Sequence, residues 1–168
     1  MPLTKPELLA LLAEIGIEQT TIEHPPLHTV EEAQAWRGDH PGGHCKNLFL
    51  KDKKGILWLI VTLEQRQLRL NRLPRALGSA RLSFASPERL WEVLGVRPGS
   101  VTPFALANDR DRQCRVVLDA PMLDFDLLNY HPLTNEATTT ISRDNLLKFI
   151  RHCGHEPIII DLEAAGGD

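Results

Sequence analysis

The sequence predicts an α+β domain built around a mixed, largely antiparallel β-sheet flanked by helices. Short β-rich runs alternate with amphipathic helical segments along the chain. Two of the β-rich runs, 47–51 and 56–63, are separated by the turn-forming residues DKKG, which is a hairpin signal. A chain of 168 residues, 42% of them hydrophobic, is the size of one domain with its own core. We therefore expect a single domain over residues 1–168, with its core within about 4–162.

Helices are predicted where apolar residues recur at helical spacing behind a residue that favours a helix start. Thr4, Thr29 and Pro87 stand at three such starts, and Glu32 completes a capping box with Thr29. One helical segment carries a break at Pro74. The predicted helices are 4–15, 30–37, 68–77, 87–95 and 143–152.

Strands are predicted in short runs of β-branched and other apolar residues between turn-forming residues. The predicted strands are 19–23, 47–51, 56–63, 81–86, 115–118, 137–141 and 157–162, with 104–106 as a further strand or extended run. Segments rich in glycine and proline between these runs are predicted to be loops, among them 38–44 and 98–103.

Positive charge is concentrated in two segments, although the formal net charge of the chain is −3. Residues 66–115 contain ten arginines, no lysine and four acidic residues, and residues 46–54 contain four lysines and one aspartate. Such segments can form a basic face for phosphates, because counterion release supplies most of the sequence-independent affinity for nucleic acid. A solvated surface with interspersed ion pairs explains the same counts, and charge alone favours that simpler interpretation.

The cysteine pattern and the apolar runs bear on the compartment. Cys45, Cys114 and Cys153 are odd in number and far apart in sequence, so neither a disulfide framework nor a zinc knuckle is indicated. The N-terminal segment is amphipathic and contains acidic residues, unlike a signal peptide. No apolar run approaches the roughly 20 residues of a membrane span. We expect a cytoplasmic protein.

Familiar hydrolase motifs are missing from the sequence, including G-x-S-x-G, H-E-x-x-H and a Walker-type phosphate loop. A serine–histidine–aspartate triad stays open, because triads are defined by geometry. His40, His44 and Cys45 are residue types that bind zinc, but the turn-forming residues between the histidines and the missing fourth ligand argue against a metal. His24 and His28 flank two prolines and are interpreted as loop residues.

Three other positions are candidates for a pocket. His131, in NYHPLTNEATTT, either lines a pocket with its polar neighbours or bonds a backbone carbonyl in a turn. The loop 99–103 contains a glycine that lets successive N–H groups receive a developing oxyanion, or it is an ordinary connection. Lys46 begins an apolar strand and either extends to solvent or supplies a charge for a phosphate.

Four motifs occur in an order that points to one family. They are HCKNLFLKDKKG (44–55), LGSARLSFAS (77–86), LGVRPGSVTPFAL (94–106) and HPLTNEAT (131–138). Together they resemble the free-standing prolyl-tRNA deacylases of the YbaK/ProX aminoacyl-tRNA editing superfamily, and the similarity extends from Glu23 to Leu162. KNLFL and HPLTN are more similar to the alanine-specific branch than to the cysteine-specific branch. The resemblance implies a mixed α/β editing fold with a pocket for the 3′-terminal adenosine and its esterified amino acid.

The resemblance also implies roles for individual residues. Lys46 is expected to hold the terminal phosphate, and His131 to line the amino-acid pocket. Gly99 and Pro103 end the loop expected to position the aminoacyl carbonyl, and these four residues form the expected catalytic site. The expected substrate-binding residues are Asn47, Ser100, Val101, Thr102 and Asn135; Lys51 and Arg81 are expected to contact the acceptor stem, and helix 30–37 to cover the pocket. No metal or cofactor is implied.

The implied function is hydrolysis, in trans, of mischarged tRNA(Pro), above all Ala-tRNA(Pro). An aminoacyl ester is already activated, so it needs mainly a positioned water and a stabilised oxyanion. The resemblance implies that a vicinal ribose hydroxyl helps to orient or deprotonate that water. A synthetase pocket for proline cannot exclude the smaller alanine, because a missing methylene is worth only about 1–3 kcal/mol. The alternatives are a deacylase for Cys- or Ser-charged tRNA and a noncatalytic module that binds tRNA or associates with the synthetase. Expected partners are the tRNA(Pro) acceptor stem and 3′ end, with prolyl-tRNA synthetase as a further candidate and without DNA or membrane.

Overall fold

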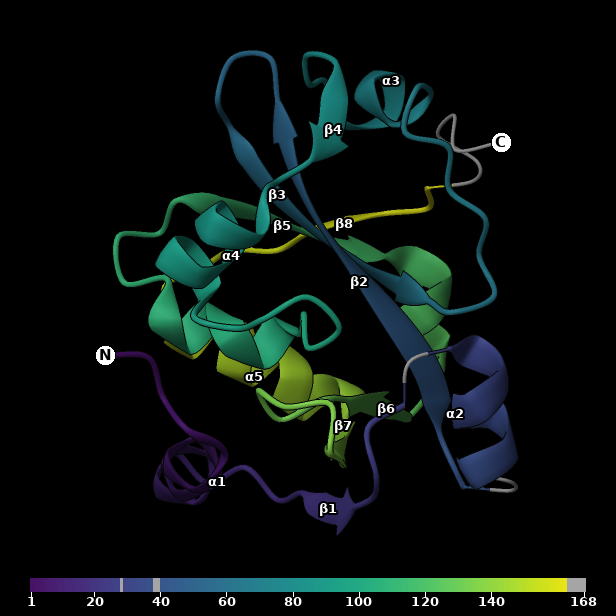
Figure 1. Cartoon of the computed structure of the whole chain (residues 1–168), viewed down its shortest axis with the longest axis vertical. Helices are drawn as coiled ribbons and strands as arrows, with labels where there is room; N and C mark the ends of the chain where they lie inside the picture. Colours follow the sequence, from purple (N-terminus) through teal and green to yellow (C-terminus); the bar gives the residue numbers. More distant parts are fainter. Residues whose placement is uncertain (28, 38–39, 163–168) are drawn as a thin grey trace.

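The computed structural model describes residues 1–27, 29–37 and 40–162 (Figure 1). His28 and two residues of the predicted loop 38–44 therefore lie outside the described residues. The helices are α1 Lys5–Glu14, α2 Val30–Arg37, α3 Leu73–Leu77, α4 Pro87–Leu94 and α5 Arg143–His152, with the 3₁₀ turns η1 Pro103–Asn108 and η2 Ala120–Asp124. The strands are β1 Thr20–Glu23, β2 Gly43–Asp52, β3 Leu57–Leu63, β4 Leu82–Phe84, β5 Cys114–Asp119, β6 Leu127–Tyr130, β7 Ala137–Ser142 and β8 Ile158–Ile160.

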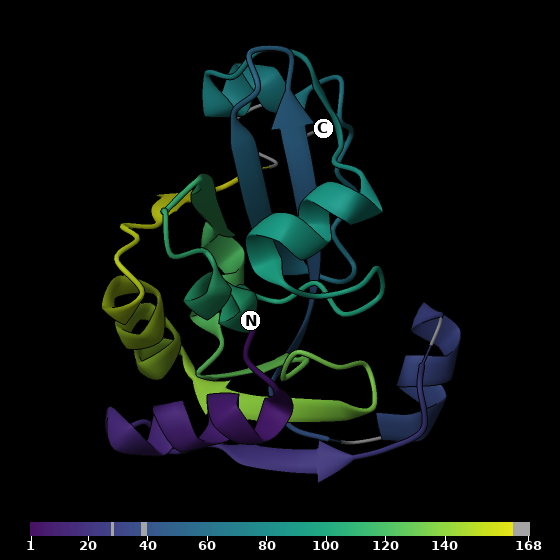
Figure 2. The ribbon, with the colours of Figure 1, turned by 60° about the vertical axis from the view of Figure 1, so that its left-hand side comes forward.

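The strands form one mixed sheet in the order β1-β7-β6-β2-β3-β5-β8, with β4 paired to β2 beside this path. The pairs β1/β7, β6/β7, β2/β3 and β2/β4 are antiparallel, and β2/β6, β3/β5 and β5/β8 are parallel. The predicted mixed, largely antiparallel sheet is confirmed. Figure 2 shows α1 lying along β1 and β7 at one end of the molecule, while the β2–β3 hairpin extends to the opposite end.

Strand β2 joins the two halves of the sheet. One edge pairs with β3 from Cys45 to Lys51. The other edge pairs with β6 only at Gly43 and His44, and with β4 only over 50–52. Because β6 separates from β2 after two residue pairs, the sheet forks near the start of β2, just after His44. This fork gives other segments access to the β2 backbone and side chains.

Two hydrophobic clusters cover opposite faces of the sheet around β3. The sequence of β3, LWLIVTL, is almost continuously apolar, as expected for a central strand that is buried on both faces. Leu57, Leu59 and Val61 join a cluster with buried residues of α1, α4, η1 and α5. Trp58 and Ile60 join a second cluster that includes residues of α3 and β4. Alternate residues of β3 therefore point to opposite cores.

The predicted helix starts agree with the structure. Thr4 forms a capping box with Glu7 at α1. The hydroxyl of Thr29 accepts the N–H of Glu32 at the start of α2, at a nitrogen–oxygen distance of 3.0 Å. Ser86 caps α4 ahead of Pro87. Among the described residues, no helix is both long and apolar enough to cross a membrane.

Three local predictions were wrong. Residues 104–106 belong to the 3₁₀ turn η1 rather than to a strand, because Thr102 caps the turn and Pro103 starts it. The helix predicted for 68–77 forms only over Leu73–Leu77, with Pro74 in its first turn rather than at a break. Gly43 and His44, predicted to be loop residues, begin β2 because β6 pairs with them.

Candidate active site

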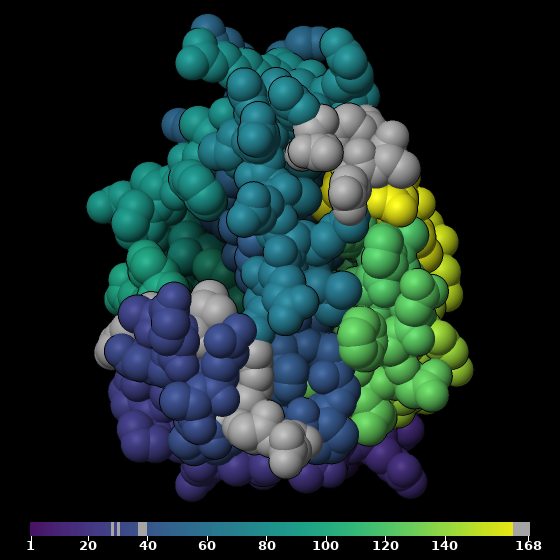
Figure 3. Space-filling model, turned by 90° about the vertical axis from the view of Figure 1, so that its right-hand side faces the viewer, coloured from purple at the N-terminus to yellow at the C-terminus, as the bar shows by residue number. Residues whose placement is uncertain are grey.

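A cavity of about 350 Å³ lies at the fork between β2 and β6. Its walls come from β2, the end of β6, the loop before η1, and α2. In the space-filling view the surface is hollowed beside α2 (Figure 3). The lining side chains are Leu27, Thr29, Ala33, Trp36, His40, His44, Cys45, Lys46, Asn47, Glu64, Gly99, Val101, Asn129, Tyr130, His131 and Thr138. The cavity therefore gathers residues from distant parts of the sequence.

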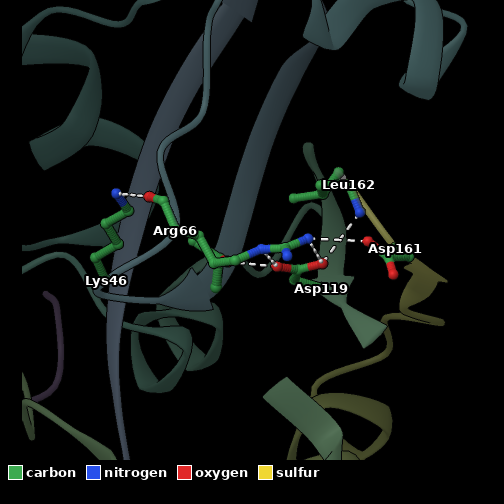
Figure 4. Close-up of polar contacts among 6 residues, drawn as sticks. Lys46, Arg66, Asp119, Asp161 and Leu162 are labelled. Atoms are coloured by element: carbon green, nitrogen blue, oxygen red, sulfur yellow. Dashed lines mark hydrogen bonds and ion pairs between the residues drawn. The ribbon is translucent and has the colours of Figure 1, made fainter. Parts of the chain in front are cut away.

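Lys46 supplies a cation to this cavity from the open edge of β2. Its ammonium donates a hydrogen bond to the main-chain carbonyl of Arg66 (Figure 4). Partial burial lowers the pKa of Lys46, while the carboxylate of Glu64 opposes that shift. The ammonium has three donors and the carbonyl takes one, so two remain for an anionic ligand.

Asn47 presents an unused hydrogen-bond acceptor beside Lys46. Its side-chain oxygen Oδ1 is buried and has no hydrogen-bond partner within the described part of the chain. A buried polar atom without a partner costs about 1–3 kcal/mol, so such an atom in a cavity wall is poised to accept a donor from a ligand. The amino group or a hydroxyl of an aminoacyl adenosine would be such a donor.

The loop before η1 brings backbone N–H groups to the cavity wall. Gly99 has a φ of +93°, a conformation that favours glycine. The N–H of Ser100 donates to the carbonyl of Arg97 at 3.0 Å, and that of Phe104 to the hydroxyl of Thr102 at 3.3 Å. Within the described residues, the N–H groups of Gly99 and Val101 have no protein acceptor. These two lining residues thus offer backbone donors of the kind that stabilise an oxyanion.

His131 fulfils both alternatives that its sequence context left open. Its Nδ1 lies 2.9 Å from the carbonyl oxygen of Ala137, and the ring also lines the cavity. Because a carbonyl only accepts, Nδ1 carries the proton, and Nε2 of the neutral ring is an acceptor. Burial lowers the pKa of His131; the bond to Ala137 opposes the shift, and nearby His24 adds to it. The ring is therefore neutral near pH 7.

The lowered pKa of His131 predicts that the folded protein loses stability as the pH falls. The unfolded chain binds a proton at a pKa of about 6.5, above that of the folded chain, so acid favours unfolding. We expect the free energy of unfolding to decrease between pH 7 and pH 5. In His131→Asn the decrease should be smaller. Urea denaturation at pH 5, 6 and 7 measures this, with exposed His152→Asn as the control.

Helix α2 closes one side of the cavity through Ala33 and Trp36, which lie one turn apart. The ring centroid of Trp36 is 4.3 Å from that of His24. His24 is a loop residue, as predicted, but it is buried and its Nε2 lies 2.8 Å from the hydroxyl of Thr138 on β7. The histidine therefore connects the helix to the sheet at the cavity.

The residues considered for zinc binding are placed by other contacts. Nε2 of His40 lies 3.1 Å from Oδ1 of Asn129 and 3.0 Å from the hydroxyl of Thr140. His44 contacts the carbonyl of His40 at 3.2 Å. Burial raises the pKa of the Cys45 thiol to about 12, so the thiolate needed by a metal or for nucleophilic attack is disfavoured. Within the ranges that the structure describes, no three metal-binding side chains converge.

The structure brings some of the residues implied by the resemblance into one site and leaves others outside it. Lys46, Asn47, Gly99, Val101 and His131 line the cavity. Ser100, Thr102 and Pro103 belong to the same loop as Gly99 but are buried and are not among the described cavity-lining residues, and Asn135 lies next to Gly99. Lys51 and Arg81 line a separate depression, together with Lys53. Lys51 is five residues along β2 from Lys46, or about 17 Å at the rise of a strand.

Several lining residues were missed by the sequence analysis. Trp36 lies in a helix that was expected to cover the pocket, so its apolar side chain was a usable signal. Asn129 and Tyr130 belong to β6, a strand that was not predicted. Glu64 follows β3 in a turn and carried no local signal.

The chain is similar to known proteins of one family. The model of the family "Aminoacyl-tRNA editing domain" matches residues 24–149. A Xenopus laevis protein called prolyl-tRNA synthetase associated domain-containing protein 1 is 42% identical, covering 94% of this chain and 96% of the relative. Prolyl-tRNA editing protein ProX of Acetoanaerobium sticklandii is 35% identical, covering 94% and 97%.

The fold is also found in solved structures. One is described as that of a candidate trans-editing enzyme for prolyl tRNA synthetase and aligns with a TM-score of 0.69. It is 22% identical, and the alignment covers 92% of this chain and 94% of that structure. The chain belongs to the aminoacyl-tRNA editing domain family, the YbaK/ProX family, and is an aminoacyl-tRNA hydrolase.

Proposed function

We propose that this enzyme hydrolyses, in trans, the ester of tRNA(Pro) mischarged with alanine. The observation that supports this most is the convergence in one small cavity of a cation, an unpaired amide oxygen and free backbone donors. The cation of Lys46 suits the terminal phosphate. Asn47 Oδ1 suits the amino group or a ribose hydroxyl. The N–H groups of Gly99 and Val101 suit the carbonyl oxygen of the ester.

The proposed reaction needs no nucleophile from the protein. Water attacks the ester carbonyl, the oxygen becomes negatively charged, and the two backbone donors stabilise it. The bond from the carbonyl carbon to the ribose oxygen then breaks, and that oxygen takes up a proton. The products are free amino acid and uncharged tRNA. Burial keeps the nearby Cys45 as a neutral thiol, so this side chain is not expected to activate the water. In the proposed reaction a vicinal ribose hydroxyl of the substrate orients the water instead.

Alanine is proposed as the substrate because the alanine-type motifs KNLFL and HPLTN contribute Lys46, Asn47 and His131 to the cavity wall. A site that accepts alanine and excludes proline would complete a double sieve. Cysteine and serine differ from alanine by one heavy atom and are the closest alternatives.

The proposal is tested by incubating the purified protein with alanyl-, cysteinyl-, seryl- and prolyl-tRNA(Pro). We expect fastest release of alanine and the slowest release of proline. Faster release of cysteine or serine would change the assigned substrate. Binding without release of any amino acid would support a noncatalytic module instead.

The depression around Lys51 and Arg81 is proposed to contact the acceptor stem. Lys53 shares this surface, and the backbone N–H of Lys53 donates to the carbonyl of Arg81 at 3.0 Å, which fixes the two segments together. At about 17 Å from Lys46 along β2, the surface lies within reach of phosphates that precede the 3′-terminal nucleotide.

Lys51→Ala and Arg81→Ala are expected to weaken tRNA binding more than they slow hydrolysis in the bound complex. Each substitution removes a charge that acts on phosphates, so the slope of log affinity against log salt should become shallower. Filter binding across a salt series and single-turnover rates at saturating enzyme measure the two effects. Lys148→Ala, an exposed lysine on α5, is the control. Wild-type affinity of both variants at moderate salt would refute the assignment.

The names of the relatives motivate a partner proposal. The Xenopus protein is named for association with prolyl-tRNA synthetase, and we propose the same partner class here. A translation-editing enzyme would act in the cytoplasm, where aminoacyl-tRNA is used. Coexpression with the synthetase and size-exclusion chromatography would test the complex.

A further inference from the structure

A polar cluster lies at the carboxyl ends of β3, β5 and β8, outside the cavity. Its centre is Asp119, the last residue of β5, whose side chain is fully buried. The carboxylate accepts hydrogen bonds from the hydroxyl of Thr62 at 2.7 Å and from the backbone N–H of Leu162 at 3.1 Å. Arg66 donates to it through Nε at 2.9 Å and through Nη2 at 3.3 Å. Figure 4 shows the guanidinium of Arg66 reaching the carboxylates of both Asp119 and Asp161.

Arg66 spans two carboxylates, because its Nη2 also donates to Asp161 at 2.9 Å. Its side chain is 17% exposed. A buried ion pair of this kind adds little net stability, since desolvation of both charges offsets much of their attraction. The guanidinium does, however, fix the orientation of the Arg66 side chain, because its N–H donors lie in one plane at fixed angles and each carboxylate must meet them there. The cluster is therefore better suited to holding a segment in place than to stabilising the fold.

The segment held in place is the turn that leaves β3. Arg66 donates its N–H to the carbonyl of Leu63 at 3.1 Å, and Glu64 donates its N–H to the carbonyl of His44 on β2 at 2.9 Å. The main-chain carbonyl of Arg66 in turn accepts the hydrogen bond from the ammonium of Lys46. The side chain of Arg66 thus points to the carboxylate cluster, while its carbonyl points to the cavity cation (Figure 4).

We infer that Arg66 is a positioning residue for Lys46: the carboxylates of Asp119 and Asp161 orient Arg66, and its carbonyl holds the ammonium at the cavity. A lysine side chain has four rotatable bonds, and ordering it without support costs rotamer entropy. The carbonyl restricts that freedom before the ligand arrives. The inference rests on the proposed phosphate-binding role of Lys46.

The test is a double-mutant cycle between Arg66 and Lys46, measured as single-turnover hydrolysis of alanyl-tRNA(Pro). Arg66→Met removes the guanidinium and keeps an unbranched side chain. It is expected to slow hydrolysis about tenfold in the wild-type background and less than about twofold when Lys46 is already alanine, because coupled residues are not additive. The hydrolysis rate of Arg66→Lys should lie between those of the wild type and Arg66→Met, since one ammonium cannot span both carboxylates.

Arg151→Met is the matched control, because Arg151 forms an ion pair with Glu156 at 3.1 Å on the exposed surface. It should leave the rate unchanged. Asp161→Asn, which removes only the half-exposed carboxylate, replaces Arg66→Met if that variant does not fold. Thermal melting of every variant reports on folding separately from the rate.

The outcomes separate this inference from the proposed function. If Lys46→Ala is slow and Arg66→Met slows both backgrounds equally, Arg66 acts on the fold and the positioning role is refuted. If Lys46→Ala retains the wild-type rate, the phosphate role of Lys46 itself fails. The affinity for a stable 3′-amide analogue of alanyl-adenosine monophosphate, measured in the same four proteins, provides a readout that does not depend on hydrolysis. Coupling in both rate and binding supports the inference.

Discussion

Lys46→Ala is expected to slow single-turnover deacylation of alanyl-tRNA(Pro) by about 10- to 150-fold. Charge-assisted hydrogen bonds contribute about 1.5–3 kcal/mol. Among the described residues that line the cavity, Lys46 is the one lysine or arginine. The substitution removes the proposed phosphate contact and leaves the carbonyl of Arg66 without its donor. Quenched-flow measurement with enzyme in excess over the charged tRNA gives the rate of the chemical step.

Lys148→Ala serves as the control for the loss of one lysine, because its side chain is exposed on α5 and does not line the cavity. Lys46→Arg gives a further comparison, since it keeps the charge but changes the shape of the donor group. We expect partial activity from that variant. A wild-type rate for Lys46→Ala would eliminate the proposed role.

His131→Ala is expected to change substrate preference more than it changes the rate on alanine. The imidazole forms part of the cavity wall, so its removal enlarges the space next to the amino acid. One methylene group in a pocket is worth about 1–3 kcal/mol, so the ratio of alanyl to prolyl hydrolysis should fall by about 5- to 150-fold. The diagnostic quantity is this ratio of single-turnover rates, because the rate on alanine also falls if the ring orients the substrate.

The competing role for His131 is general-base catalysis through its free Nε2. A lost general base lowers the rate on each substrate by about 100-fold or more and leaves the preference unchanged. Equal decreases in the rates on alanyl- and prolyl-tRNA(Pro) would therefore refute the role of His131 in size selection and favour direct catalysis by its imidazole. His131→Asn, which preserves a polar group near the carbonyl of Ala137, separates loss of volume from loss of the backbone contact.

The sequence by itself determined the elements whose signals are local. Capping residues such as Thr4 and Thr29 begin helices through contacts within one turn, and DKKG closes the β2–β3 hairpin between neighbouring runs. Sequence resemblance also selected Lys46, Asn47 and His131, which the structure gathers in one cavity.

Tertiary structure alone decided how distant segments meet. Strand β6 has four residues, too few for a periodic signal, and it is defined by its pairing with β2 and β7. Residues 104–106 have strand-like composition, yet the cap of Thr102 and the proline after it form a 3₁₀ turn. Composition is a weak guide in such short segments, because non-local pairing and local capping override it.

The contacts of the site residues are also decided by the tertiary structure. The bond from Lys46 to the carbonyl of Arg66 joins residues 20 apart in sequence, and the ion pair of Arg66 with Asp119 joins residues 53 apart. Residue types reveal which groups can carry charge or donate hydrogen bonds. Their distances, burial and pKa values depend on the packing of strands that are remote in the chain, so no local pattern encodes them.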